Sequence, residues 1–75
     1  MKRYIIEVTH YCDRGSYVTR FGRSDERMNS KKMDNDHIRK LGYKTIEGAK
    51  KNWYYNNALD QHDLKIVAKI LEFDV

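Results

Sequence analysis

Residues 42–59 read GYKTIEGAKKNWYYNNAL and predict the main helix of this chain. Thr45 can accept a hydrogen bond from the free amides of the first turn, and Glu47 adds negative charge near the positive end of the helix dipole. Gly42 suits a sharp turn just upstream. Gly48 would let the helix approach a sheet closely, at a cost of roughly 1 kcal/mol relative to alanine. The rest of the chain is expected to pack against this helix.

The predicted helix has an apolar stripe, because Ile46, Ala49 and Trp53 recur at spacings of three and four. The opposite side is expected to carry the polar residues Lys50, Lys51 and Asn52. We interpret Trp53, Tyr54 and Tyr55 as residues of the core and its rim. A base-stacking or interface role for Tyr54 or Tyr55 is the alternative.

The length of 75 residues predicts a single domain, 1–75, with one thin core. Such a domain has little room for a deep enzyme pocket, so the sequence predicts a protein that is not an enzyme. Charged residues make up 35% of the chain, aromatic residues 12%, and proline is absent. This composition is typical of a folded domain rather than a disordered tail.

The formal net charge is +4, and it is unevenly distributed. Residues 1–53 carry a net charge of +6, whereas residues 54–75 carry −2. A basic region of this kind is attracted to nucleic acid or to a protein that carries it. The sequence therefore favours nucleic acid, or a nucleic-acid-associated protein, as the partner.

Cysteine content and hydrophobicity predict a cytoplasmic protein. Cys12 is the single cysteine, which rules out an internal disulfide and fits a reducing compartment. The apolar run at Tyr4, Ile5 and Ile6 is far too short for a secretory signal or a membrane span. We expect no membrane association.

The first quarter of the chain predicts a β-hairpin. Residues 3–11 are rich in β-branched and aromatic side chains, with apolar residues on both faces, as expected of a central strand. Residues 12–15 contain Asp13 and Gly15, which favour a turn with positive φ at the glycine. Residues 16–23 predict the second strand.

The next stretch, residues 24–41, is polar until its end. Residues 24–32 predict an exposed loop. Asp34 can cap a short helix over residues 35–41, whose Ile38 and Leu41 are spaced to contact the core.

The end of the chain predicts a turn over residues 60–63 and a third strand over residues 65–75. A helix is the rival interpretation, because Leu64, Val67, Ala68 and Leu71 also share a helical face. Since β-branched and aromatic residues dominate, we favour the strand.

Together these elements predict an α+β fold of ββ(α)αβ type. The sheet is expected to have three strands, antiparallel or mixed, in the order 2-1-3, with one main helix on one face. No second helix is expected on the other face. That exposed face, with tyrosine and arginine on it, is a candidate for binding or for a homodimer contact.

One motif consists of Gly42, Tyr43, Lys44 and Thr45, followed by Glu47, Ala49, Lys50 and Trp53. It resembles the helix start of the AP2-like, arm-binding N-terminal domains of phage tyrosine integrases, in which a helix packs on three strands. In that family all three strands precede the helix, whereas here the third predicted strand follows it. This order resembles that of short phage and plasmid proteins of ββαβ type. The resemblance implies a mobile-element origin and a role as a nucleic-acid binder or as an inhibitor of host or defence enzymes.

Two short stretches contain potential metal ligands. His10 and Cys12 could lie on one side of a strand end, but zinc sites usually have four ligands and no second pair follows. Residues 34–36 read Asp-Asn-Asp, like the opening of a calcium loop, but Arg39 stands where that loop needs glycine. The sequence predicts no metal, no cofactor and no catalytic residue.

The strongest candidate site is a basic and aromatic set in the hairpin and the following loop. Its members are Tyr11, Arg14, Tyr17, Arg20, Arg23, Arg27, Lys31 and Lys32. Lysine and arginine can neutralise phosphates while aromatic rings stack on unpaired bases. An ordinary solvated hairpin and loop is the alternative interpretation of the same residues.

Two functional hypotheses follow. The first is a small basic protein of phage or mobile-element origin that binds nucleic acid or a nucleoprotein in the host cytoplasm. The second is a phage-type protein inhibitor or adaptor, for example an anti-CRISPR protein, that acts through protein contacts. The two overlap if the target is itself a nucleic-acid enzyme.

Overall fold

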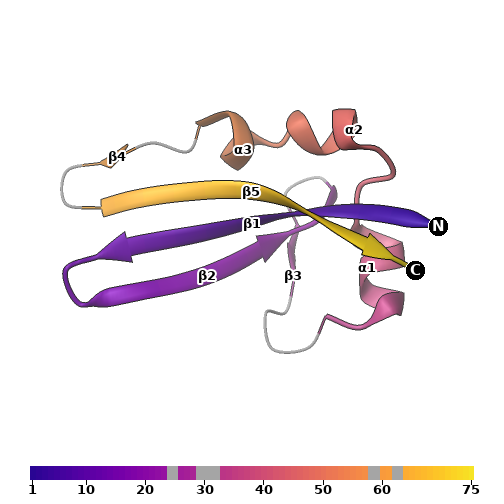
Figure 1. Cartoon of the computed structure of the whole chain (residues 1–75), viewed down its shortest axis with the longest axis horizontal. Helices are drawn as coiled ribbons and strands as arrows, with labels where there is room; N and C mark the ends of the chain where they lie inside the picture. The colour runs from indigo at the N-terminus through magenta and orange to yellow at the C-terminus, as the bar shows by residue number, and fades with distance from the viewer. Residues whose placement is uncertain (24–25, 29–32, 58–59, 62–63) are drawn as a thin grey trace.

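The computed structural model describes residues 1–23, 26–28, 33–57, 60–61 and 64–75 (Figure 1). Its strands are β1 (Lys2–Cys12), β2 (Gly15–Phe21), β3 (Arg27–Met28), β4 (Asp60–Gln61) and β5 (Leu64–Asp74). Its helices are α1 (Asn35–Leu41), α2 (Ile46–Lys50) and α3 (Trp53–Asn57). None of the helices in these residues is long and apolar enough to cross a membrane.

The strands form one sheet in the order β3-β2-β1-β5-β4, and all neighbouring strands are antiparallel. The predicted order 2-1-3 is confirmed for the long strands, which are β2, β1 and β5. The prediction of only three strands is wrong, because short segments beside β2 and β5 add β3 and β4 at the edges. The rival helical interpretation of residues 65–75 is also wrong, since this stretch forms most of β5.

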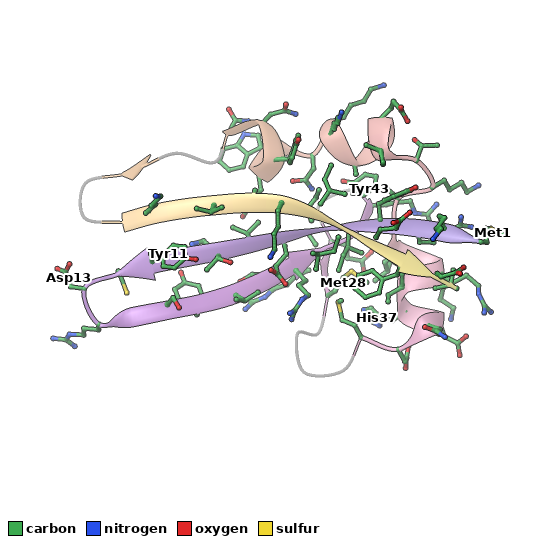
Figure 2. The ribbon with its side chains drawn as sticks, in the orientation of Figure 1. Met1, Tyr11, Asp13, Met28, His37 and Tyr43 are labelled. Atoms are coloured by element: carbon green, nitrogen blue, oxygen red, sulfur yellow. The ribbon has the colours of Figure 1, made fainter. Side chains whose placement is uncertain are left out.

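The β1–β2 hairpin turns at the loop of Asp13 and Arg14, as predicted, and Cys12 pairs with Gly15 across its end. Gly15 has a φ of +129°, a conformation that side chains strongly disfavour. Figure 2 shows Tyr11 and Asp13 at this end of the sheet and Met1 at the opposite end.

The helices α2 and α3 cover one face of the sheet, which we call the first face. It carries the buried Ile6 and Val8 of β1 and Phe21 of β2. Ala49 of α2 is fully buried against them, and Tyr54 of α3 packs at the edge of the same cluster. This layer corresponds to the predicted packing of the main helix on the sheet.

The opposite, second face is covered at one end by α1. Ile5 of β1, Met28 of β3 and Ile38 of α1 form a buried cluster there, with Leu71 and others around it. The prediction that this face has no helix is therefore wrong for the part near the N-terminus of β1. The physical reason is that Ile38 and its neighbours, although on a helix of only two turns, supply enough apolar surface to bury Ile5.

The segment between α1 and α2 passes alongside β1, and the chain thereby crosses from the second face of the sheet to the first. Tyr43 and Tyr4 exchange backbone hydrogen bonds of 2.9 and 2.7 Å. Tyr4 lies beyond Ile6, the last residue of β1 in this direction that pairs with β2. Gly42 lies so close to α1 that a Cβ there would be 2.6 Å from the carbonyl oxygen of Ile38. The glycine is needed for this close approach, and its φ of −72° is an ordinary one. The predicted cap of α1 is confirmed, since Asp34 Oδ1 accepts a 2.8 Å bond from the His37 amide.

The predicted continuous helix over residues 42–59 is interrupted. Thr45 caps α2 as predicted, with its Oγ1 accepting a 3.0 Å hydrogen bond from the Gly48 amide. The helix then ends at Lys50, and α3 begins anew at Trp53. Residues 58 and 59 lie outside the described residues, as do most of the predicted loop of residues 24–32 and half of the predicted turn of residues 60–63.

The two ends of the described chain lie side by side in the sheet. Lys2 pairs with Asp74 in register, and the Met1 amino group donates a 3.0 Å hydrogen bond to the Asp74 carboxylate. This hydrogen bond and the positive charge of the amino group lower the pKa of Asp74. The central strand β1 therefore has the last strand as one of its partners.

Candidate binding surface

The predicted aromatic residues of the hairpin lie on opposite faces of the sheet. Tyr17 is opposite His10 on the first face, and the two rings stack with centroids 4.4 Å apart. Tyr11 is opposite Ser16 and therefore lies on the second face. Because they lie on opposite faces, these two tyrosines cannot stack on neighbouring bases of one short, single-stranded nucleic acid.

Arg20 is engaged in an ion pair. Its guanidinium lies 3.0 Å from the carboxylate of Glu7, which also pairs with Lys69 at 3.3 Å. Glu7 and Arg20 are both largely buried at the side chain, and they face each other across β1 and β2. A phosphate would have to displace Glu7 from Arg20. The ion pair with Glu7 therefore gives Arg20 a structural role that the sequence pattern did not reveal.

The other predicted basic residues are dispersed. Arg23 donates a hydrogen bond to the carbonyl of Lys40 at the end of α1. Arg27 lies exposed on β3 opposite Phe21, and Arg14 lies in the hairpin loop. Lys31 and Lys32 lie outside the described residues. The described members of the predicted set therefore do not converge on one surface.

Aromatic and basic side chains are instead concentrated around α2 and α3. We call this group the Trp53 surface, and its members are Lys44, Lys50, Lys51, Trp53 and Tyr55. Trp53 is 56% exposed, and Tyr55, two residues further along α3, is also exposed. The lysines are exposed, and none of them forms an ion pair with another described residue. The acidic residue among them is Glu47, in the first turn of α2.

The indole of Trp53 is held in place although it is exposed. Tyr54 stacks on the buried Phe21 with centroids 4.4 Å apart, and Trp53 meets Tyr54 edge-on at 5.0 Å. A series of rings therefore connects an exposed aromatic face to the core.

Asn52 positions the start of α3. It is 2% exposed, contrary to the prediction that it points away from the core. Its Oδ1 accepts hydrogen bonds from the amides of Tyr54 at 2.8 Å and Tyr55 at 3.3 Å, as a helix cap does. Its Nδ2 donates to the hydroxyl of Tyr43 at 3.2 Å. Asn52 thus fixes the break between the helices and the direction in which Trp53 points.

The sequence analysis assigned Trp53 to the core and its rim and did not identify it as an exposed residue of a binding surface. The apolar stripe of residues 46, 49 and 53 assumes an unbroken helix, but the break at Asn52 rotates Trp53 out of that stripe. Ile46, the first residue of α2, is also exposed, so only Ala49 of the predicted stripe is buried. The break in the helix could have been predicted from Asn52, which directly precedes the aromatic residues 53–55, because asparagine favours helix starts.

At the hairpin end, no helix among the described residues covers the second face, which the sequence predicted for the whole face. Thr9 is flanked by Val18 on β2 and Val67 on β5 in a row across the sheet, and Tyr11 lies beyond them. Tyr11, Val18 and Val67 are all exposed. Lys65 is opposite Tyr11, so this apolar patch has a basic margin.

The residues considered as metal ligands have other contacts. The Cys12 thiol donates a 3.2 Å hydrogen bond to the carbonyl of Gly15, and His10 stacks on Tyr17. No group of three or more histidine, cysteine, aspartate or glutamate side chains in the described part of the chain could hold a metal ion.

Comparisons of this chain with protein-family models, curated proteins and solved structures gave no match. The resemblance of residues 42–53 to AP2-like domains therefore stays a prediction from the sequence.

Proposed function

We propose that this protein is a small, non-enzymatic basic module that binds single-stranded nucleic acid, free or in a nucleoprotein, through the Trp53 surface. The observation that carries the proposal is the exposed indole of Trp53, held by Tyr54 and preceded by Lys50 and Lys51. We further propose a phage or mobile-element origin and a cytoplasmic site of action, from the resemblance and composition described above.

The preference for single strands follows from the chemistry of stacking. A base can stack on an indole only when its face is free of neighbouring bases, and each such contact is worth about 1–3 kcal/mol. The lysines of the Trp53 surface would contact phosphates on either side of that base. With three lysines, the slope of log affinity against log salt should be roughly −2, because each phosphate contact in a single strand contributes about −0.7.

A binding role is also favoured by the shape of the molecule. The shortest principal extent of the chain is 16 Å, which corresponds to a flat domain without the depth of a usual enzyme pocket. The carboxylates of Glu7, Glu72 and Asp74 take part in ion pairs. These features support a surface that binds rather than a site that reacts.

The first experiment uses the fluorescence of Trp53, which is the sole tryptophan of the sequence. We would titrate the protein with single-stranded and duplex DNA and RNA at several salt concentrations. Stacking on the indole should quench its emission with single strands more than with duplexes. Trp53→Ala, followed with a labelled oligonucleotide, should weaken binding about 5- to 150-fold.

Two charge-matched double variants test where the phosphates bind. Lys50→Glu with Lys51→Glu alters the Trp53 surface, whereas Arg14→Glu with Lys65→Glu alters the hairpin end by the same net charge. The first pair should reduce affinity by about tenfold or more, and the second should have a much smaller effect. Equal losses would indicate attraction by net charge alone. A loss only in the second pair would instead place binding at the hairpin predicted from sequence.

A second candidate function is supported by the apolar patch of Tyr11, Val18 and Val67 on the second face. Exposed apolar patches with polar margins are typical of protein interfaces. This patch suits a phage-type inhibitor or adaptor, for example an anti-CRISPR protein, that contacts its target directly. A host protein that is retained after nuclease treatment, and lost on Val67→Lys, would favour this function over nucleic-acid binding.

A further inference from the structure

The outer edge of β2 is only partly covered. The short strand β3 pairs with β2 through Arg20 and Phe21. Residues 15–19 pair with no strand on that side in the part of the chain that the structure describes. The residues from 15 to 18 are exposed. Among the described residues, the sheet therefore ends there in a short open edge.

The hydrogen-bonding groups of this edge can be assigned from the hairpin. Its loop has only two residues, so the closing pair of Cys12 and Gly15 must be hydrogen-bonded to each other. Backbone groups alternate in direction along a strand, so those of Ser16 and Val18 point to the outer edge. Arg20, two residues further on, pairs with β3 on that same edge.

This edge lacks the features that usually prevent strand pairing. Monomeric proteins protect open edges with charged side chains, proline, bulges or a covering helix. Residues 15–19 contain no charged residue and no proline. By contrast, β5 carries Lys65, Lys69 and Glu72, and α2 and α3 pack against that strand (Figure 1). The two long outer strands thus differ in their protection.

We propose that a second copy of this chain pairs with β2 through this edge. We call residues 15–19 of β2 the open window. It is symmetric about Tyr17, because the residue on each side of Tyr17 has backbone groups that point to the outer edge. In an antiparallel pair centred on Tyr17, Ser16 of one copy would be hydrogen-bonded to Val18 of the other, in both directions. Gly15 would lie opposite Thr19, and the window would then be filled. The two sheets would become one continuous sheet.

Two neighbouring features fit this arrangement. The strand β3 already occupies the edge at Arg20, so the incoming strand must stop there, which fixes the register. Tyr17 is 58% exposed and its ring is held by His10. The two Tyr17 rings would meet on the first face as a cross-strand aromatic pair. This accounts for an exposed tyrosine in the middle of the window.

The association should be weak and should strengthen with salt. The window is short, so the interface is smaller than those of stable dimers. Each copy carries a formal net charge of +4, and salt screens the repulsion between the copies. Nucleic-acid binding has the opposite dependence on salt, so the two proposals can fail separately.

Sedimentation velocity of the full chain, without nucleic acid and over a range of protein and salt concentrations, tests the proposal. We expect a dimer that increases with both. Val18→Pro removes an outward N–H from each copy and should weaken the dimer about tenfold or more. The control Val18→Thr keeps the N–H and the β-branched shape, so it should associate like the original protein.

Amide hydrogen exchange of the unaltered protein provides a test that no folding defect can obscure. Raising the protein concentration should slow exchange at Ser16 and Val18, whose amides become paired. The amides of Tyr17 and Thr19 point toward β1 and should not change. A monomer at all concentrations, or a dimer without this alternation, would overturn the proposal.

Discussion

Gly22→Ala should lower the free energy of unfolding by about 3 kcal/mol or more, the largest effect that we expect from a single methyl group in this protein. A Cβ at Gly22 would lie 2.1 Å from the carbonyl oxygen of Leu41 and 2.7 Å from its carbonyl carbon. Because these atoms belong to the backbone at the end of α1, no rotamer change can relieve the overlap. Either β2 or α1 must move.

Urea denaturation followed by circular dichroism measures this effect. A small domain has a stability of about 5 kcal/mol, so the variant should keep only about 2 kcal/mol and unfold at a much lower urea concentration. Gly48→Ala is the matched control, since its Cβ would approach only the Thr45 hydroxyl at 3.2 Å and Tyr43 at 3.6 Å. The control should change stability by no more than about 1 kcal/mol. Equal midpoints for both variants would show that α1 does not pack against β2 in this way.

Asn52→Ala should cost about 2–3 kcal/mol, since it removes a helix cap and a buried hydrogen bond together. The amides of Tyr54 and Tyr55 would lose their acceptor, and the Tyr43 hydroxyl would lose its donor. Because these groups are partly buried, water cannot fully replace Asn52. The loss should affect the start of α3 first.

Trp53 reports this change directly, because it is the first residue of α3. In Asn52→Ala, its near-ultraviolet circular dichroism should weaken and its emission should become easier to quench with iodide. Asn57→Ala is the control, since Asn57 is exposed and, among the described residues, its side chain donates to the backbone carbonyl of Trp53 at 2.8 Å and not to the indole. An unchanged signal in Asn52→Ala would mean that the aromatic contacts alone hold Trp53. Oligonucleotide affinity should fall with the signal, because the stacking surface would no longer be held in place.

The elements of the fold that depend on local chemistry could be predicted from the sequence. The turn at Gly15 and the caps at Asp34 and Thr45 each need only a few neighbouring residues, and all three are confirmed. The last strand was also recognised by its β-branched residues. The helix over residues 35–41 was predicted, but its position on the second face was not, because that position depends on the distant apolar partners of Ile38.

The candidate site was harder to predict, for two physical reasons. The role of Arg20 depends on strand register, which places it opposite Glu7, and a count of charges cannot show this. The exposure of Trp53 depends on a break at Asn52, whereas a helical pattern assumes continuity. In both cases a single hydrogen-bonding residue decides which side chains remain available to a partner.

The pairing of β1 with β5 also has a consequence for biosynthesis. The central strand β1 is synthesised before the other described strands, yet its long neighbour β5 is synthesised after them, with Lys2 opposite Asp74. Sheets that join such distant segments fold slowly, because a long loop must close before any contact compensates for the lost chain entropy. While the ribosome is still synthesising residues 64–74, Ile5 and Ile6 lack a strand on one side and stay open to chaperones or to aggregation. A nonsense mutation before β5 should therefore yield a chain that cannot fold, rather than a slightly smaller domain.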